Sequence, residues 1–381
     1  MTAADKLWTN SGDSHFIEPP DLYEKRLPAD LADRLPRSER ISDEEEIVHI
    51  DGEQIRRSIP KPSEETARMM AEFRAKQNSE EQSAGAAATG SVRLKHLDEQ
   101  GVWGEVVYPS LGLWYAQIRS IDLVAAAARA LNDYVAEELV AASPRLVPTA
   151  TLPLQSVEAS ATEIARVAKL GFHAIFFPTG PPAGMPFWND PSWMPLWDSC
   201  AEHDQVVAFH IGTNGSPGAR RFRGAGGALL NYVDTSCEGQ LAAVGMVASG
   251  ALERHPDLKV LISEGGGSWA PFIGDRMNEF FRQQPMWNDG RLSLLPKEYV
   301  MRQVYASFQH DETAVPTLTA MGYRNIMFGT DYPHIEGTYP NTQKVLHGLL
   351  EGVDEATSDR IRCGAFLDLF PHVGRPVPTA A

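Results

Sequence analysis

The chain has 381 residues, of which 43% are hydrophobic and 22% are charged, with 31 glycines and 27 prolines. This balance is typical of a folded globular protein and excludes a collagen-like, coiled-coil or largely disordered chain. The 34 basic and 50 acidic residues give a formal net charge of −16, which disfavours nucleic acid and anionic membrane surfaces as partners.

Targeting and redox signals point to the cytoplasm. No window contains the ~18 consecutive apolar residues of a membrane helix, and residues 1–10 lack the apolar core of a secretory signal. The three cysteines (Cys200, Cys237 and Cys363) are too scattered for a disulfide framework. We therefore expect a cytoplasmic protein.

Short apolar runs of β-type composition alternate along the chain with segments of helical spacing. That spacing is clearest over 122–141 and 157–169, where apolar residues recur every three or four positions. Eight strands are predicted, at residues 10–17, 102–107, 147–153, 173–178, 205–211, 257–263, 303–308 and 325–330. This alternation predicts an α/β fold, a parallel (β/α)8 TIM barrel that spans residues 1–381 as one domain; a doubly wound sheet is the alternative.

Two stretches do not fit the repeat. Residues 38–92 contain an acidic run, a hairpin signal at Asp51-Gly52 and a polar segment, so we interpret them as an insertion after strand one that could serve as a lid. Residues 212–231 form a long glycine-rich loop with Arg220, Arg221 and Arg223. This basic cluster could bind a carboxylate, although a solvated loop is the simpler interpretation.

Chemistry-bearing residues stand at the predicted strand ends, where barrel enzymes place their active sites. Strand one ends with Asp13 and His15, strand five with His210, strand six with Glu264 and strand eight with Asp331. Asp13 and His15 are two residues apart and so share one face of a strand. Imidazole and carboxylate donors suit a divalent cation, zinc above all and manganese as a second choice.

Simpler roles exist for the same residues. Asp13 and His15 could be a buried hydrogen-bonded pair, and Asp331 could cap a following helix. His310 and His334 follow strands seven and eight and are candidates, with Glu264 and Asp331, for proton transfer.

These residues together resemble a known set. Asp13-Ser-His-Phe-Ile-Glu-Pro19, His210, Glu264-Gly-Gly-Gly-Ser-Trp-Ala-Pro271 and Gly329-Thr-Asp-Tyr-Pro-His334 resemble the amidohydrolase-related family, which includes aminocarboxymuconate semialdehyde decarboxylase and the resorcylate-type decarboxylases. The resemblance covers almost the whole barrel but not the insertion.

The resemblance implies a distorted (β/α)8 barrel with one divalent metal, usually zinc or manganese. Its ligands would be Asp13, His15, His210 and Asp331. Two departures from the family pattern stand out: Asp13, where His or Glu is common, and Glu264, where the decarboxylases carry a histidine.

Because of Glu264, the sequence favours a metal-dependent hydrolase of a small carbonyl- or carboxylate-bearing substrate, with Asp331 as general base to a metal-activated water. The alternative is a metal-dependent non-oxidative decarboxylase of an aromatic or muconate-type acid, in which Asp331 protonates the ring carbon. A barrel that binds small molecules without catalysis is the third interpretation. The family analogy leaves a homodimer open as the assembly.

Overall fold

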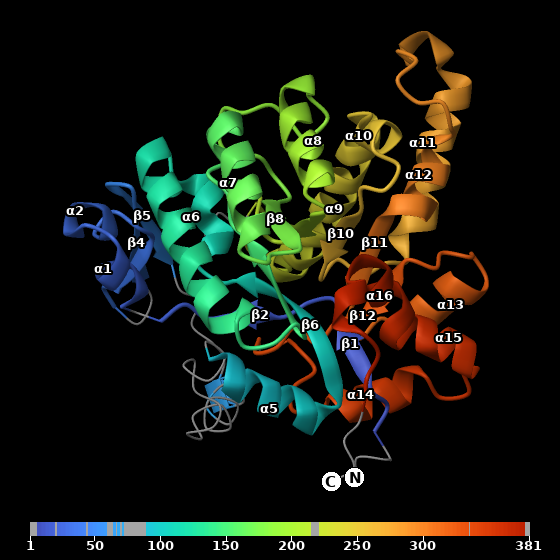
Figure 1. Cartoon of the computed structure of the whole chain (residues 1–381), viewed down its shortest axis with the longest axis horizontal. Helices are drawn as coiled ribbons and strands as arrows, with labels where there is room; N and C mark the ends of the chain where they lie inside the picture. The colour runs from blue at the N-terminus through green and yellow to red at the C-terminus, as the bar shows by residue number, and fades with distance from the viewer. Residues whose placement is uncertain are drawn as a thin grey trace.

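The protein is a closed barrel of eight parallel strands wrapped by helices (Figure 1). The structure, a computed structural model, describes residues 6–19, 21–42, 45–58, 64, 65, 67, 68, 71, 89–214, 221–334 and 336–377. The strands are β1 (Thr9–Ser11) and β2 (His15–Phe16), which together make the first barrel strand, and β6 (Val102–Pro109), β7 (Leu146–Ala150), β8 (Ala174–Pro178), β9 (Val206–His210), β10 (Val260–Ser263), β11 (Val304–Phe308) and β12 (Ile326–Phe328). Each of the eight predicted strands is present, and the predicted barrel is confirmed.

Hydrogen bonds between the first and last strands close the barrel. The Gly12 amide donates to the Phe328 carbonyl (2.8 Å), and the Asp331 amide donates to the Asp13 carbonyl (2.9 Å). This closure rules out the doubly wound sheet, whose edges would stay open. The predicted strand over 10–17 is split because its register against β6 shifts near Ser11.

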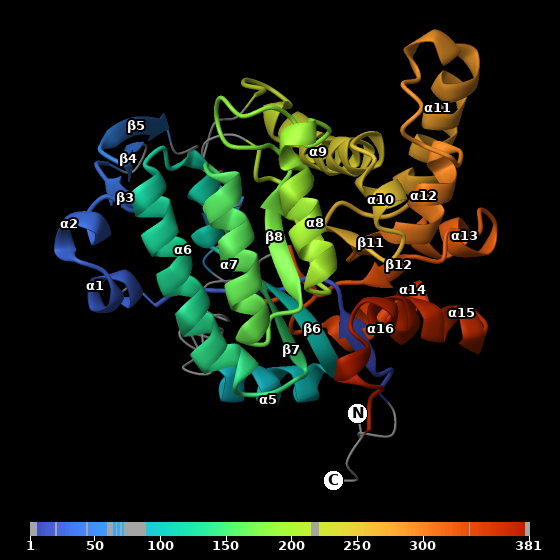
Figure 2. The same cartoon turned by 45° about the horizontal axis from the view of Figure 1, so that its top comes forward.

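Helices cover the outside of the barrel, and α6, α7 and α8 stand side by side on one flank (Figure 2). α7 has the predicted bounds, whereas the segment predicted over 122–141 is α6 followed by a wider π-helical turn over Ala136–Val140. The outer helices are α5 (Gly90–Gln100), α6 (Ile121–Val135), α7 (Val157–Lys169), α8 (Met194–Glu202), α9 (Gly227–Ala248), α10 (Ala251–Arg254), α11 (Trp269–Gln283), α12 (Pro296–Gln303), α13 (Ala314–Thr319), α14 (Thr342–Leu349) and α15 (Glu355–Asp359).

Apolar side chains fill the barrel interior up to the C-terminal ends of its strands. Alternate residues point inward, so Val206 and Ala208 of β9 meet Leu261 of β10 and Met327 of β12. Phe366, on α16 (Ala365–Leu369), belongs to the same cluster. The packed interior leaves the C-terminal rim for polar side chains.

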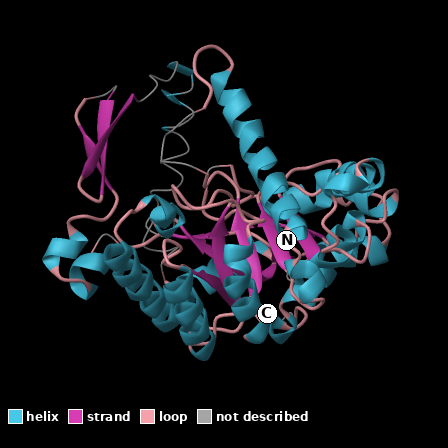
Figure 3. Cartoon of the chain, turned by 90° about the horizontal axis from the view of Figure 1, so that it is seen from above, coloured by secondary structure: helices cyan, strands magenta, loops and turns pink. Residues whose placement is uncertain are grey.

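The described part of the predicted insertion forms a separate small sheet. After α1 (Leu22–Arg26) and α2 (Ala29–Ala32), strands β3 (Arg37–Arg40), β4 (Glu45–Ile50) and β5 (Glu53–Ser58) pair antiparallel and stand away from the barrel (Figure 3). Asp51 and Gly52 both have positive φ at the β4–β5 turn, which confirms the predicted hairpin. Residues 59–63 and 72–88 of the predicted insertion, and Arg220 of the predicted basic loop, lie outside the described residues.

The predicted absence of a membrane helix and of a disulfide framework can be compared with the described residues. None of the helices in the described part combines the length and hydropathy needed to cross a bilayer. All three cysteines are free.

Glu238 anchors α9 to the rim of the barrel. Its carboxyl accepts a hydrogen bond from Thr179 Oγ1 (3.3 Å) at the end of β8, and Asn214 also bonds to it. Burial raises the pKa of Glu238 to about 7, and the charge of Asp234 adds to the effect. The folded protein therefore holds this proton to a higher pH than the unfolded chain does.

This difference predicts how Glu238→Gln changes stability with pH. The ordinary pKa of a glutamate is 4.5, so between pH 4.5 and about 7 the unfolded chain has lost this proton while the folded protein still holds it. The free energy of unfolding of the wild type therefore falls as the pH rises through this window. We expect E238Q to melt at a higher temperature than the wild type at pH 8 and at a similar temperature at pH 4.5. Thermal unfolding followed by circular dichroism checks this, and a pH-independent difference would contradict it.

Candidate metal centre

Two imidazole rings face each other at the barrel rim. His15 begins β2 and His210 ends β9, and their Nε2 atoms lie 3.0 Å apart although 195 residues separate them in the chain. Each Nδ1 is directed at a backbone carbonyl: that of Pro109 at 3.4 Å for His15 and that of Ile211 at 2.8 Å for His210. Donation from Nδ1 leaves both Nε2 lone pairs directed at the same point, as in a metal site.

Two buried carboxylates complete this group. Asp13 Oδ1 lies 3.5 Å from His210 Nε2 and 3.9 Å from His15 Nε2, while Asp331 Oδ1 lies 3.4 Å from His15 Nε2. Asp13 and Asp331 are fully buried. The structure thus brings together all four residues that the sequence predicts as ligands.

The carboxylate oxygens are short of hydrogen-bond donors. Asp13 Oδ1 and both Oδ atoms of Asp331 are buried and have no hydrogen bond in the described structure. Asp13 Oδ2 has one distant donor, Gln309 Nε2 at 3.5 Å, and the nitrogen nearest to Asp331 Oδ1 is His334 Nδ1 at 2.9 Å. Because burying unpaired carboxylates is costly, these oxygens call for a positive charge among them.

The pKa values of the two histidines show which of them can carry a positive charge as a proton. Burial lowers the pKa of His15 to about 3. Burial also disfavours the charged form of His210, but the charges of Asp13 and Glu264 outweigh it and raise the pKa of His210 to about 9. A proton on His210 therefore partly balances the buried acids, and a divalent cation would replace it.

The donor set fits a divalent metal. The donor atoms of Asp13, His15 and His210 all lie within 4.8 Å of one another, and so do those of Asp13, Glu264 and Asp331. Two imidazole nitrogens with carboxylate oxygens suit zinc and manganese, whereas calcium and magnesium prefer oxygen donors alone.

An uncommon backbone conformation sets the direction of the side chains of Asp331 and Glu264. Asp331 and Glu264 are non-glycine residues with positive φ, 51° and 65°, each just after a strand. This conformation costs of order 1–3 kcal/mol and is frequent at functional sites. In the alternation of β10, residue 264 would point away from the barrel interior. The positive φ of Glu264 turns its side chain toward the rim instead, and its Oε2 lies 3.5 Å from His210 Nε2.

His334 and Glu264 are the titratable neighbours of the four residues. His334 Nδ1 lies 2.9 Å from Asp331 Oδ1, and its ring stacks on that of His15 with centroids 3.9 Å apart. Burial raises the pKa of Glu264 to about 8, partly offset by His210. Both residues, predicted from the sequence for proton transfer, therefore lie at the centre.

His310 is not brought to this centre. It is exposed, and its Nε2 lies 3.2 Å from the Glu336 carbonyl oxygen. The alternation of β11 explains the difference: Tyr305 belongs to the interior cluster and Gln309 reaches Asp13, so His310 takes the outward parity. Gln309, which sequence reasoning passed over, is the residue of this strand that reaches Asp13, and the period of two was the signal that could have identified it.

Tyr108 supports the imidazoles from inside the barrel. Its ring lies 4.9 Å from that of His210, and its hydroxyl lies 2.7 Å from Ser263 Oγ. Ser263 Oγ donates in turn to the Gly12 carbonyl (3.0 Å), beside Asp13. The packed interior therefore fixes the rings from below, which a loop could not do.

A family model described as Amidohydrolase matches residues 106–365, more than half of the chain. The chain belongs to the amidohydrolase family. This confirms the family expected from the motifs, and the matched range contains His210, Glu264 and Asp331.

Relatives of this amidohydrolase are named as decarboxylases. The chain is 29% identical over 296 residues to 2-amino-3-carboxymuconate-6-semialdehyde decarboxylase of Dictyostelium discoideum, covering 74% of this chain and 77% of the relative. It is 26% identical to gamma-resorcylate decarboxylase of Rhodococcus jostii (strain RHA1), over 64% of this chain and 76% of the relative.

The fold agrees with solved structures of similar enzymes. A variant of 5-carboxyvanillate decarboxylase from Novosphingobium aromaticivorans, solved with bound manganese and 3-methoxy-4-hydroxy-5-nitrobenzoic acid, matches with a TM-score of 0.67. The two chains are 15% identical, and the match covers 97% of this chain and 99% of that one. At this identity the likeness supports the fold alone.

The facing imidazoles predict the effect of removing either one. We expect wild-type protein loaded with zinc or manganese and then desalted to retain about one metal per chain, and His15→Ala and His210→Ala to retain almost none. Elemental analysis measures this. His203→Ala is the matched control, because His203 follows α8 and precedes β9 at the opposite end of the barrel. Equal metal loss in all three variants would contradict the assignment.

Proposed function

We propose that this chain is a metal-dependent, non-oxidative decarboxylase of a small aromatic or muconate-type carboxylic acid. The observation that carries the proposal is the pair of Nε2 atoms of His15 and His210, 3.0 Å apart beside buried carboxylate oxygens without hydrogen bonds. The names of the two curated relatives support the reaction class.

In this proposal His15, His210, Asp331 and Asp13 hold one divalent cation, either manganese or zinc. The cation would supply positive charge next to the carboxylate of the substrate. Manganese in a structural neighbour supports that choice of metal, and the donor set suits zinc equally well.

Asp331 is the residue that we assign to proton delivery. His334 Nδ1, 2.9 Å from Asp331 Oδ1, is the nearest ring nitrogen that can supply it with a proton. A proton passes from Asp331 to the carbon that bears the carboxylate. The bond between this carbon and the carboxylate carbon then breaks. Its electron pair returns to the ring or the conjugated chain, and carbon dioxide leaves.

Hydrolysis is the second candidate, and Glu264 is the observation that favours it. A carboxyl group 3.5 Å from His210 with its pKa raised to about 8 can share proton transfer with Asp331 during attack by water. Ester, amide and vinylogous diketone substrates test this candidate against the first.

The reaction class is tested with metal-loaded protein in ¹⁸O-labelled water. Hydroxybenzoates and muconate-type acids are compared with esters, amides and vinylogous diketones. We expect carbon dioxide from an acid and no ¹⁸O in the organic product. Incorporation of ¹⁸O into a cleaved ester or amide, with no carbon dioxide from any acid, would establish the hydrolase instead.

Replacing Asp331 by asparagine removes its proton-carrying oxygen. We expect D331N to lower kcat by about 10²- to 10⁴-fold, the usual contribution of general acid–base catalysis. Glu312→Gln, at an exposed carboxylate after β11, is the control and should keep wild-type kcat. Retention of wild-type kcat by D331N would remove Asp331 from the mechanism.

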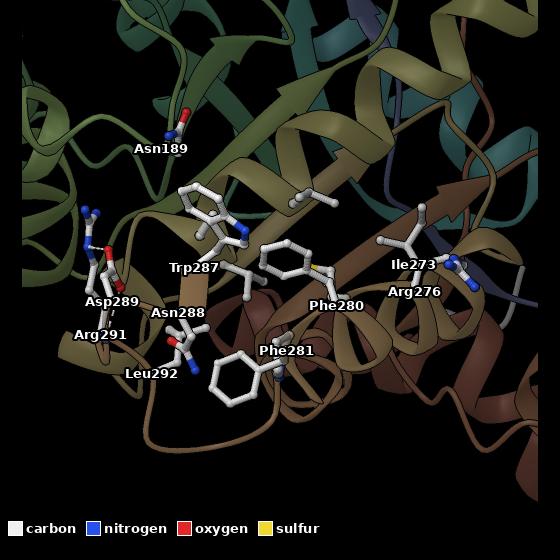
Figure 4. A pocket seen from close by; sticks show the side chains of 15 residues that line it. Asn189, Ile273, Arg276, Phe280, Phe281, Trp287, Asn288, Asp289, Arg291 and Leu292 are labelled. Carbon is white, nitrogen blue, oxygen red and sulfur yellow. Dashed lines mark hydrogen bonds and ion pairs between the residues drawn. The ribbon is translucent and has the colours of Figure 1, made fainter. Parts of the chain in front are cut away.

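We also propose that a second copy of this chain covers an apolar groove between α9 and α11. The groove, about 520 Å³, is lined by Val244, Val247, Met277, Phe280 and Trp287 among others (Figure 4). Trp287 is 74% exposed and Met286 73%, which is costly for a monomer in water. The charges beside the groove are paired within the chain, Arg276 with Glu279 and Arg291 with Asp289, so a neutral apolar face meets its own copy without repulsion.

Sedimentation measures this assembly. We expect a wild-type dimer, and a monomer when Trp287 and Phe280 are both replaced by aspartate, because the dimer would bury the added charges. Met321→Asp changes an exposed apolar side chain elsewhere and should leave the dimer intact. A monomeric wild type would contradict the proposal.

A further inference from the structure

One buried arginine holds the main chain that carries His15. Arg93, on α5, has no exposed surface. Its Nη1 donates to the His15 carbonyl (2.6 Å) and its Nη2 to Ser14 Oγ (2.8 Å). The same guanidinium pairs through Nε with Glu105 of β6, which is also fully buried. These three contacts tie Ser14 and His15, at the start of β2, to β6.

The same helix also contacts the side chain of Tyr332, the residue that follows Asp331. The Arg93 guanidinium carbon lies 5.1 Å from the centre of the Tyr332 ring, and the Tyr332 hydroxyl lies 2.8 Å from Nδ1 of His96. Arg93 and His96 are three residues apart and so share one face of α5. Tyr332 follows Asp331 directly, and its carbonyl accepts a hydrogen bond from the His15 amide (2.6 Å).

We propose that Arg93 and His96 of α5 are positioning residues that set the spacing between the metal ligands His15 and Asp331. The inference rests on the proposed metal centre and names residues outside its donor set. The two ligands come from opposite ends of the chain, with His15 Nε2 3.4 Å from Asp331 Oδ1. α5 bridges the main-chain segments that carry them.

Arginine is required for this role by its shape. A planar guanidinium donates in several fixed directions at once and stacks on an aromatic ring, whereas a lysine ammonium is a point charge on a flexible stem. Arg93→Lys keeps the charge that Glu105 needs, so the fold should survive while the directed contacts to His15 and Ser14 are lost. Loss of partners that orient ligands typically weakens metal binding about 10- to 100-fold.

The test compares metal affinity in three metal-free proteins: wild type, R93K and Arg145→Lys. Arg145 is a matched control, because it also ties α5 to the barrel, donating to Asp98 Oδ1 (2.6 Å) and stacking 4.4 Å from the centre of the Trp103 ring. It precedes β7, at the end of the barrel opposite the metal centre. Co²⁺ is titrated against a competing chelator, and its visible absorption bands report ligand geometry along with the dissociation constant.

We expect R93K to raise the Co²⁺ dissociation constant about 10- to 100-fold and to shift the absorption bands, with R145K matching the wild type. Wild-type affinity in R93K, or equal weakening in R145K, would overturn the positioning role. A wild-type protein that binds no Co²⁺ would instead overturn the metal centre itself, so the two failures are distinguishable.

Two further variants keep the test decisive. Should R93K not fold, the double variant Arg93→Met with Glu105→Met removes both buried charges at similar volume, and the same affinity criterion applies. Tyr332→Phe removes only the hydroxyl that meets His96 and keeps the ring beside Arg93. It should weaken Co²⁺ binding less than R93K does, and an unchanged dissociation constant would remove His96 from the proposal.

Discussion

Everything at the barrel rim depends on buried carboxylate oxygens that lack hydrogen-bond donors and face two imidazole nitrogens. Asp13 and Asp331 are fully buried, and three of their four carboxylate oxygens have no hydrogen bond from the described residues, which is costly. The raised pKa of His210 shows how strongly the acids attract a positive charge. A divalent cation satisfies the same demand with two charges, and its binding would release the proton.

The barrel fold supplies this arrangement because its closure joins the first strand to the last. Asp13 and His15 lie on strand one and Asp331 follows strand eight, so the bonds that close the barrel also bring these three proposed ligands together. His210 reaches the same point from across the interior, above the ring of Tyr108. The packed apolar interior lies below this group and supports it from inside the barrel.

Much of this could be predicted from local patterns. Apolar runs and helical spacing identified the eight strands, and residue types at strand ends identified the four residues that converge. The prediction of His310 rested on proximity to a strand end and did not use the alternation that turns Gln309, rather than His310, toward Asp13. Arg93 could not be found this way, since its role depends on contacts with residues about 80 positions earlier and about 240 later, and no local pattern encodes them. The same ligands serve hydrolysis and decarboxylation, so the reaction needed the relatives as well.

X-ray absorption spectroscopy of the manganese-loaded wild-type protein tests the central claim most directly, because it reports which atoms surround the ion. The account predicts scattering from two imidazole rings together with carboxylate oxygens. A metal shell of oxygen atoms alone, or no stably bound metal, would show that His15 and His210 face each other for another reason and that the centre described here does not exist.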